Sequence, residues 1–397
     1  MFEQVPTALP DAILGLTEAF RKDPNPHKIN LGVGVYKDEQ GNTPVMACVK
    51  EAQRRLLEAE KNKNYLPIEG SPEYGQRVRE LLLGPDHEAI TSGRAVTAHT
   101  PGGTGALRVV ADYLKKLHPA TRVWLSEPTW PNHPQLFSAA GLDLRTYPYF
   151  DAQTSALAFD AMLDTLGREL RPGDVVLLHA CCHNPTGVDP TPQQWDQIAA
   201  LLHEKQALSL VDFAYQGLGD GLEQDAVGLK RLAQPDRELI VCSSFSKNFG
   251  LYNERVGALT IIARQASQAQ AVLSQVKTCI RTNYSNPPAH GGAIVTTILA
   301  DAGLRAQWEG EVQQMRDRIQ GMRRLFVQTL QAKGAKRDFS FIERQKGMFS
   351  FSGLNKEQVE RLRKEEAIYI VGSGRINVAG MTPANMDRLC QAIVKVL

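Results

Sequence analysis

The feature that most constrains the fold is a repeated alternation of short apolar runs with longer amphipathic stretches between about residues 95 and 265. Several of the runs are continuously apolar, which is typical of strands that are covered on both faces. One intervening stretch, 191–205, places Trp195, Ile198 and Leu202 on one face of a helix. The pattern predicts an α/β domain with a mostly parallel sheet. The predicted strands are 122–125, 144–147, 175–179, 208–212, 239–242 and 257–262.

The pattern changes after about residue 300. Apolar residues at spacings of three and four predict one long helix over 302–333. We expect a smaller α+β domain after it, joined by the N-terminal segment, because that segment flanks the α/β part of the chain. In these parts the sequence predicts strands at 339–342, 348–352 and 376–378, helices at 11–22, 356–366 and from Pro383, and an extended segment at 29–36. The predicted domains are 1–45 as the N-terminal part of the small domain, 46–310 as the large domain and 311–397 as the rest of the small domain.

The composition argues against several classes of protein. Lys and Arg number 45 against 43 Asp and Glu, a net charge of +2, so we expect no broad attraction to nucleic acid or to an anionic membrane. No stretch approaches the ~20 apolar residues that span a bilayer, and the N-terminus lacks the pattern of a secretory signal. The six cysteines show no C-x-x-C spacing. We therefore expect free thiols in the cytoplasm and no metal site.

A lysine stands in SSFSKNFG (243–250), directly after a predicted buried strand. Loops at the carboxyl ends of strands are where α/β proteins form their sites. Burial in such a loop lowers the pKa of a lysine amine and makes the amine nucleophilic. Lys247 is therefore a candidate nucleophile, although the motif alone also fits an ordinary exposed lysine.

An acidic residue, Asp212, ends a predicted strand in LVDFAYQG (210–217). A buried carboxylate needs a cationic partner, because an unpaired buried charge is costly. A protonated pyridine nitrogen would serve, and so would a neighbouring arginine in an ordinary salt bridge. Tyr215 follows three residues later and would either donate its hydroxyl to the same ligand or pack as a core tyrosine.

Two further motifs suggest anion and oxygen binding. The glycine-rich TPGGTGAL (100–107) opens an amphipathic stretch, and free N–H groups at a helix start favour a phosphate, although small glycine turns are common without one. Arg255, in NERVG, would add a fixed positive charge. Asn184, in CCHNPTG, can donate to a phenolic oxygen or simply form a turn.

Two arginines are candidates for binding substrate. Arg375 lies in VGSGRINVAG and Arg281 in IRTNYSNPP, both in stretches rich in Gly, Ser, Asn or Pro. A guanidinium group can bind a carboxylate through two parallel charge-assisted hydrogen bonds. Most arginines are solvated surface groups, and only the neighbouring Gly, Ser, Asn and Pro make these two better candidates for substrate binding than the other arginines.

Taken together, these motifs resemble the fold-type I pyridoxal-phosphate aminotransferases, specifically the aspartate/aromatic subgroup of class I. The resemblance implies a three-layer fold with a mostly parallel central sheet, a smaller α+β domain, and pyridoxal 5'-phosphate as cofactor. It runs nearly end to end, through INLGVGVYKDEQGNTP, NYLPIEG, TPGGTGAL, SEPTWPNH, HACCHNPTG, VDFAYQG, SSFSKNFGLYNERVG, NYSNPPAHG, GMFSFSG and GRINVAGMTP.

The resemblance gives each candidate residue a role. Lys247 would hold the cofactor as a Schiff base and shuttle the proton, while Asp212 would pair with the ring nitrogen and keep the ring an electron sink. With Tyr215, these would be the catalytic residues. The other cofactor-binding residues would be Asn184 beside Tyr215 at the phenolic oxygen, Trp130 on the ring face, and Gly103, Thr104, Ser244, Arg255 and Tyr65 at the phosphate. The substrate-binding residues would be Gly34, Trp130, Asn184, Arg281 and Arg375, with Arg375 at the α-carboxylate.

The resemblance also implies a homodimer with shared active sites. Tyr65 and Arg281 of each chain would reach into the site of the other copy, where Arg281 would bind the distal carboxylate of the substrate. The reaction would be a ping-pong transamination between an amino acid and a 2-oxo acid.

Within the subgroup the sequence favours the aspartate-type branch. The expected substrates are L-aspartate or L-glutamate with 2-oxoglutarate or oxaloacetate. The alternative is an aromatic aminotransferase of dual specificity, because the distal arginine of such relatives can swing aside for a ring. The aspartate-type choices are Val35, Lys37, Thr43, Asn64, Thr104 and Asn286.

Two other classes of protein fit less well. A nicotinamide oxidoreductase would use GGTGAL as its dinucleotide turn, but the glycine spacing is wrong and SSFSKNFG stays unexplained. A non-catalytic protein on the same scaffold should have lost Lys247, Asp212 or Arg375, and all three are present.

Overall fold

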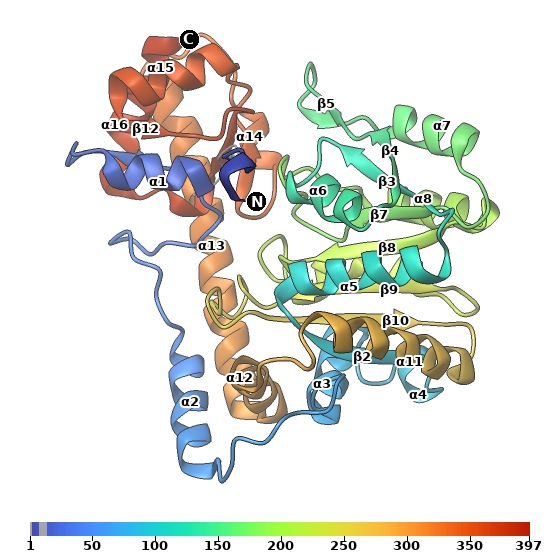
Figure 1. The fold of residues 1–397 in the computed structure, drawn as a ribbon. Helices are drawn as coiled ribbons and strands as arrows, with labels where there is room; N and C mark the ends of the chain where they lie inside the picture. The colour runs from blue at the N-terminus through green and yellow to red at the C-terminus, as the bar shows by residue number, and fades with distance from the viewer. Residues whose placement is uncertain (1, 8–13) are drawn as a thin grey trace. The chain divides into compact units, whose positions relative to one another are not determined.

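Seven strands form the central sheet of the computed structural model, in the order β2-β10-β9-β8-β7-β3-β4 (Figure 1). Strand β10 is antiparallel to both β2 and β9, and the remaining pairs are parallel. The predicted mostly parallel sheet is therefore confirmed, and every predicted strand in it is found within two residues of its expected bounds. The strands are β2 (Ala95–Pro101), β3 (Arg122–Glu127), β4 (Asp143–Pro148), β7 (Val175–His179), β8 (Leu208–Phe213), β9 (Leu239–Ser244) and β10 (Val256–Ile262).

The sequence pattern does not predict β2, the edge strand next to β10. Its Thr and His residues interrupt the apolar run, although all of its residues except the last are buried. The Thr97 hydroxyl lies 2.9 Å from the Thr260 hydroxyl on β10, so the pair satisfies its own hydrogen bonding inside the sheet. Polar residues are thus accommodated in a buried strand.

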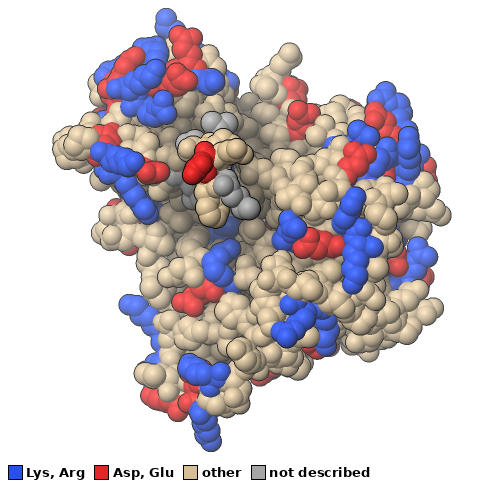
Figure 2. All heavy atoms as spheres, in the orientation of Figure 1, with Lys and Arg blue, Asp and Glu red and all other residues tan. Residues whose placement is uncertain are grey.

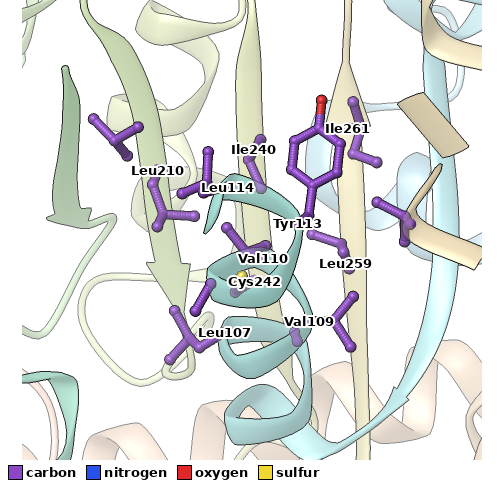
Figure 3. Close-up of a cluster of buried hydrophobic side chains, with 14 of the residues drawn as sticks. Leu107, Val109, Val110, Tyr113, Leu114, Leu210, Ile240, Cys242, Leu259 and Ile261 are labelled. Atoms are coloured by element: carbon purple, nitrogen blue, oxygen red, sulfur yellow. The ribbon is translucent and has the colours of Figure 1, made fainter. Parts of the chain in front are cut away.

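Helix α5 (Gly102–Leu117) covers one face of this sheet. Its apolar residues recur at spacings of three and four, so they form one stripe along the helix. Figure 3 shows Leu107, Val110 and Leu114 of this stripe beside strand residues such as Leu210 and Ile240, and all five belong to one buried cluster. This packing holds α5 against the sheet, and the helix begins directly after the last residue of β2.

The structure describes residues 2–7 and 14–397, and the chain divides into two compact units. The larger unit comprises 44–184 and 188–316, and the smaller comprises the residues up to Thr43, the short segment 185–187 and 317–397. Helix α13 (Ala302–Ala332), predicted over 302–333, is continuous across the boundary at Arg316. The predicted domain boundaries at 45/46 and 310/311 stay a prediction.

Helices surround the sheet within the larger unit. Helix α8, predicted over 191–205, begins with a capping box in which the Thr191 hydroxyl accepts from the Gln194 amide and the Gln194 side chain caps Thr191 in return. A short hairpin, β5 (Phe150–Asp151) with β6 (Ala156–Leu157), follows β4. The other helices are α2 (Ala47–Ala59), α3 (Pro72–Leu83), α4 (Glu88–Thr91), α6 (Asn132–Ala139), α7 (Phe159–Glu169), α8 (Pro192–Glu204), α9 (Leu222–Asp225), α10 (Val227–Leu232), α11 (Ala266–Asn283) and α12 (Ala289–Ala300).

The smaller unit is an α+β arrangement, as predicted. One prediction within it is wrong: 339–342 is not a strand, because α14 (Phe341–Arg344) forms a single helical turn there, with Phe341 and Ile342 buried. The predicted helix at 11–22 is found from Leu14 onward, and 11–13 lie outside the described residues. Its other elements are η1 (Phe2–Gln4), α1 (Leu14–Lys22), β1 (Ile29–Asn30), β11 (Phe349–Phe351), α15 (Lys356–Glu366), β12 (Ile368–Tyr369), β13 (Arg375–Asn377), η2 (Val378–Gly380) and α16 (Pro383–Val396).

The surface mixes both signs of charge. On the face drawn in Figure 2, Lys and Arg are interleaved with Asp and Glu, in keeping with the small net charge of +2. Among the described residues, no helix is both long enough and apolar enough to cross a membrane.

Candidate active site

The candidate residues of the larger unit gather at one edge of the central sheet. Strand register pairs Asp212 with His179 on one side and with Cys242 on the other, so the carboxyl ends of β7, β8 and β9 lie together. Because β10 is antiparallel to both of its neighbours, the end of β2 reaches the same edge, where Pro101 pairs with Val256. Polar groups that follow these strands therefore converge.

Asp212 is buried, and its partner is a histidine rather than the arginine that the sequence left open. His133 Nε2 lies 3.0 Å from Asp212 Oδ2, and the Thr129 hydroxyl lies 2.7 Å from the other ring nitrogen of His133. Burial by itself would raise the pKa of Asp212, but the hydrogen bond from His133 and the positive charge of Lys247 lower it below its ordinary value. The carboxylate therefore stays ionised, which suits a partner for a ring N–H⁺.

A second histidine stands behind this pair. One ring nitrogen of His133, one of His179 and a carboxylate oxygen of Asp212 all lie within 4.8 Å of one another. Burial, together with the charge of His133, lowers the pKa of His179 to about 3, so its ring is neutral at physiological pH. Neither histidine was a candidate in the sequence, although His133 ends the motif SEPTWPNH and His179 begins the motif HACCHNPTG. In the structure His133 lies in the first turn of α6, three residues after Trp130, which precedes that helix.

Lys247 lies in the turn after β9, beside Tyr215. Its Nζ atom is 4.9 Å from the centre of the Tyr215 ring. The Asn184 side-chain amide donates to the Tyr215 hydroxyl at 3.4 Å, and both residues are buried. The structure thus brings together the amine and the two hydrogen-bonding groups that the sequence assigns to the phenolic oxygen. Trp130 is half-buried, with its ring edge-on to His133 at 5.2 Å.

The glycines before α5 form a tight cradle. A Cβ on Gly102 would lie 2.5 Å from Arg255 Nη2, and one on Gly103 would lie 3.1 Å from the Cβ of Ser244. The Arg255 guanidinium thus packs directly against the start of this 16-residue helix, where the first N–H groups have no partner within the helix. Thr104 is exposed in the first turn of α5. Gly102 was not in the predicted set, and its φ of +76° explains why glycine is needed there.

Two predicted residues lie on the surface of the larger unit. Tyr65 is 90% exposed. Arg281, near the end of α11, is also exposed, and its guanidinium donates to the Ser285 hydroxyl. Exposure of a tyrosine ring and a guanidinium is what the predicted sharing of sites between two copies requires.

The remaining two predicted residues, Gly34 and Arg375, belong to the smaller unit. Arg375 is buried on β13, donates to the Gly32 carbonyl at 2.6 Å and lies over the Phe349 ring at 4.2 Å. A Cβ on Gly34 would meet the same ring at 2.6 Å. Phe349 thus packs against both, and Gly34 must be glycine for this close approach.

The residues of the larger unit fit pyridoxal 5'-phosphate. The cradle before α5 offers N–H groups and a guanidinium for a dianionic phosphate. Asp212, held ionised by His133, offers a carboxylate for a pyridinium nitrogen, and Lys247 offers a primary amine for a carbonyl. These groups occur on one sheet edge in a single unit, so one molecule can use all of them.

Known proteins confirm the resemblance. The model of the family "Aminotransferase class I and II" matches residues 26–393. Aspartate aminotransferase of Escherichia coli (strain K12) is 59% identical over 397 residues, which cover 100% of both chains. Aromatic-amino-acid aminotransferase of Pseudomonas aeruginosa is 46% identical over 100% of this chain and 98% of its own.

Among solved structures, the aromatic-amino-acid aminotransferase from Burkholderia pseudomallei, covalently bound to pyridoxal phosphate, superimposes with a TM-score of 0.97. It is 49% identical and covers 100% of this chain and 99% of its own. The chain therefore belongs to the class I and II aminotransferases, and the protein is a pyridoxal-phosphate-dependent transaminase.

Proposed function

We propose that the protein transfers the amino group of L-aspartate or L-glutamate to a 2-oxo dicarboxylic acid, with Lys247 as anchor of the cofactor and carrier of the proton. The observation that supports these roles is the convergence of Lys247, Tyr215 and the ionised Asp212 at one sheet edge. Each polar group of the cofactor then has a partner of complementary charge.

The residues divide the work between holding and moving protons. When bound, pyridoxal phosphate accepts the electrons left at the substrate Cα after its proton is removed. Asp212 keeps the ring nitrogen protonated, because a buried carboxylate favours a positive charge beside it. The Lys247 amine would take the Cα proton and return it to the C4′ carbon of the cofactor, and general acid–base transfer of this kind contributes roughly 10²–10⁴-fold. Arg375 would bind the α-carboxylate of the substrate, which is the role that the family resemblance implies for it.

The cofactor assignment has a simple test. Purified protein, or protein supplied with pyridoxal phosphate, should absorb visible light, and Lys247→Ala should lack the band that depends on the lysine link. Wild-type protein that stays colourless with added cofactor would contradict the assignment. A Lys247→Ala variant with the wild-type spectrum would show that another amine is the anchor.

Aspartate is proposed as the preferred substrate over aromatic amino acids. The aspartate-type residues, Asn64, Thr104 and Asn286 among them, support this choice, as does the identity of 59% to an aspartate aminotransferase against 46% to an aromatic one. With 2-oxoglutarate as acceptor, kcat/KM for aspartate should exceed that for phenylalanine. Equal or reversed values would favour the alternative, an aromatic aminotransferase of dual specificity.

We further propose a homodimer in which Tyr65 and Arg281 complete the site of the other copy. Their exposure in the single chain supports this arrangement. Mixing Lys247→Ala with Arg281→Ala subunits tests it, because a hybrid dimer would carry both defects in one site and leave the other intact. Random mixing should restore about a quarter of the wild-type activity toward aspartate. A mixture as inactive as its two parents would place Arg281 in its own chain's site.

The cytoplasm is the compartment we propose for the protein. All six cysteines are free and buried, which suits a reducing environment. Recovery of the activity in the periplasmic or extracellular fraction of the source cells would contradict this.

A further inference from the structure

We propose that Asn248, Trp308 and Arg316 are positioning residues that hold Lys247 beside Tyr215. They do so through hydrogen bonds, called ties below, that join the turn after Lys247 (the lysine turn) and the loop after Tyr215 (the tyrosine loop) to each other and to helix α13. The inference rests on the roles proposed above for Lys247 and Tyr215. Every contact that carries it lies within the larger unit. None of the three side chains is needed to touch the cofactor or the substrate.

The first tie holds the lysine turn. Trp308 Nε1 donates to the backbone carbonyl of Asn248, the residue after Lys247, at 2.7 Å. The Trp308 side chain is fully buried and stacks on Phe249 at 4.5 Å with an interplanar angle of 16°. The carbonyl belongs to the residue that follows Lys247, so this bond fixes the backbone of the turn that carries the lysine.

The second tie joins the two loops to each other. The Asn248 side-chain amide donates to the Gln216 carbonyl at 3.1 Å, and Gln216 follows Tyr215 directly. The Gln216 amide in turn donates to the carbonyls of Leu81 and Leu222, each at 3.2 Å. Both Asn248 and Gln216 are buried, so these bonds do not compete with water. The lysine turn and the tyrosine loop therefore cannot shift independently.

The third tie fastens the tyrosine loop to the same helix. Arg316 Nη1 donates to the Gly217 carbonyl at 2.9 Å. Gly217 has a φ of +93°, and a Cβ there would lie 2.7 Å from Val312 Cγ1. Trp308, Val312 and Arg316 are spaced by four, so they form one stripe along α13. One face of a single helix thus positions the backbone that follows Lys247 and the backbone that follows Tyr215.

The consequence concerns the chemical step more than substrate binding. Proton transfer depends on the placement of the Lys247 amine, and a displacement of about 1 Å can lower a rate by about 100-fold. Loss of one tie should therefore lower kcat while KM changes little. It should also shift the pH midpoint of the visible absorbance of the bound cofactor, because that midpoint depends on how Lys247 and Tyr215 are placed around it.

The test replaces Trp308 by Phe, which removes the N–H donor and keeps an aromatic ring against Phe249. Trp124→Phe is the matched control. Trp124 is equally buried in the same unit and donates its Nε1 to Asp174 at 2.9 Å, but Asp174 precedes β7, at the sheet edge away from Asp212. Both variants lose one buried tryptophan hydrogen bond, so a general loss of stability should affect them alike.

We expect Trp308→Phe to lower kcat about 10- to 100-fold, with KM within about twofold, and to shift the absorbance midpoint, whereas Trp124→Phe leaves both at wild-type values. Arg316→Met removes the third tie at a half-buried position and should change the same two quantities. If Trp308→Phe does not fold, Arg316→Met carries the test. The inference is overturned if the folded variants keep the wild-type midpoint and kcat, or if Trp124→Phe changes them equally. A wild-type spectrum for Lys247→Ala would instead overturn the proposed function on which it rests.

Discussion

Replacing Gly102 by Ala tests whether the glycine cradle before α5 holds a phosphate. Gly102 has a φ of +76°, and its added Cβ would lie 2.5 Å from Nη2 and 3.0 Å from Cζ of Arg255. The atoms in the way are the far end of a flexible side chain, so the guanidinium would swing aside while the backbone stays in place. The variant should fold, but with Arg255, the arginine predicted to bind the phosphate, displaced.

Two separate effects follow, and each has its own magnitude. A left-handed backbone at a non-glycine residue costs about 1–2 kcal/mol in the free energy of unfolding. Displacing Arg255 removes a charge-assisted hydrogen bond to the phosphate, which contributes about 1.5–3 kcal/mol. The dissociation constant for pyridoxal phosphate should therefore rise about 10- to 150-fold.

Gly173→Ala separates the two effects. Gly173 has a φ of +85° in the same unit, and no other atom lies within 4 Å of its added Cβ. Both variants should lose similar stability in urea unfolding, and only Gly102→Ala should bind the cofactor more weakly when the apoenzyme is titrated by absorbance. If the two variants bind pyridoxal phosphate with the same affinity, the cradle is not the phosphate site.

Three other predictions concern charge. Asp212→Asn should lower kcat about 10³-fold in steady-state assays. A neutral amide loses roughly 4 kcal/mol of attraction to a ring cation, taken as about 4 Å away at an effective dielectric of 20. A decrease of less than tenfold would show that Asp212 is not the partner of the ring nitrogen. Arg281→Ala should reduce kcat/KM for aspartate far more than for phenylalanine, and a uniform loss would show that it is not the distal carboxylate clamp. Burial lowers the pKa of His99 from 6.5 to about 4, so stability is lost as the pH falls from 6.5 toward 4, because only the unfolded chain takes up the proton. That pKa difference of about 2.5, at 1.36 kcal/mol per unit, corresponds to about 3 kcal/mol in the free energy of unfolding. In urea unfolding, His99→Asn should lose less stability than the wild type between pH 6.5 and 4. An equal loss in both proteins would show that His99 is not the group responsible.

The sheet was predictable where burial leaves a plain signature. Strands covered on both faces, such as β7 and β9, are continuous apolar runs, and the structure finds them within two residues of their expected ends. Strand β2 escapes prediction because its polar residues are satisfied by a neighbour that is distant in sequence, as the Thr97–Thr260 contact shows. The segment 339–342 fails for a different reason: a short apolar run fits a buried helical turn as well as a strand.

The site divides along the same line. Lys247 and Asp212 follow buried strands, so their position at the sheet edge could be inferred from the sequence. His133 could not, because only the folded chain brings α6 to the end of β8 and places its ring 3.0 Å from Asp212. The need for glycine at position 102 could not be inferred either. It depends on the close approach of Arg255, which lies about 150 residues later in the sequence.

The division of the chain has a consequence for the order in which it folds. The larger unit comprises 44–184 and 188–316, so a growing chain has made every strand of the central sheet, and the Lys247 proposed as cofactor anchor, before the last part is synthesised. The smaller unit must wait, because Ile29 pairs with Ile368 in the short parallel contact of β1 with β12. Its first segment therefore spends most of synthesis without a strand partner, and closing that long loop is expected to be a late step in folding.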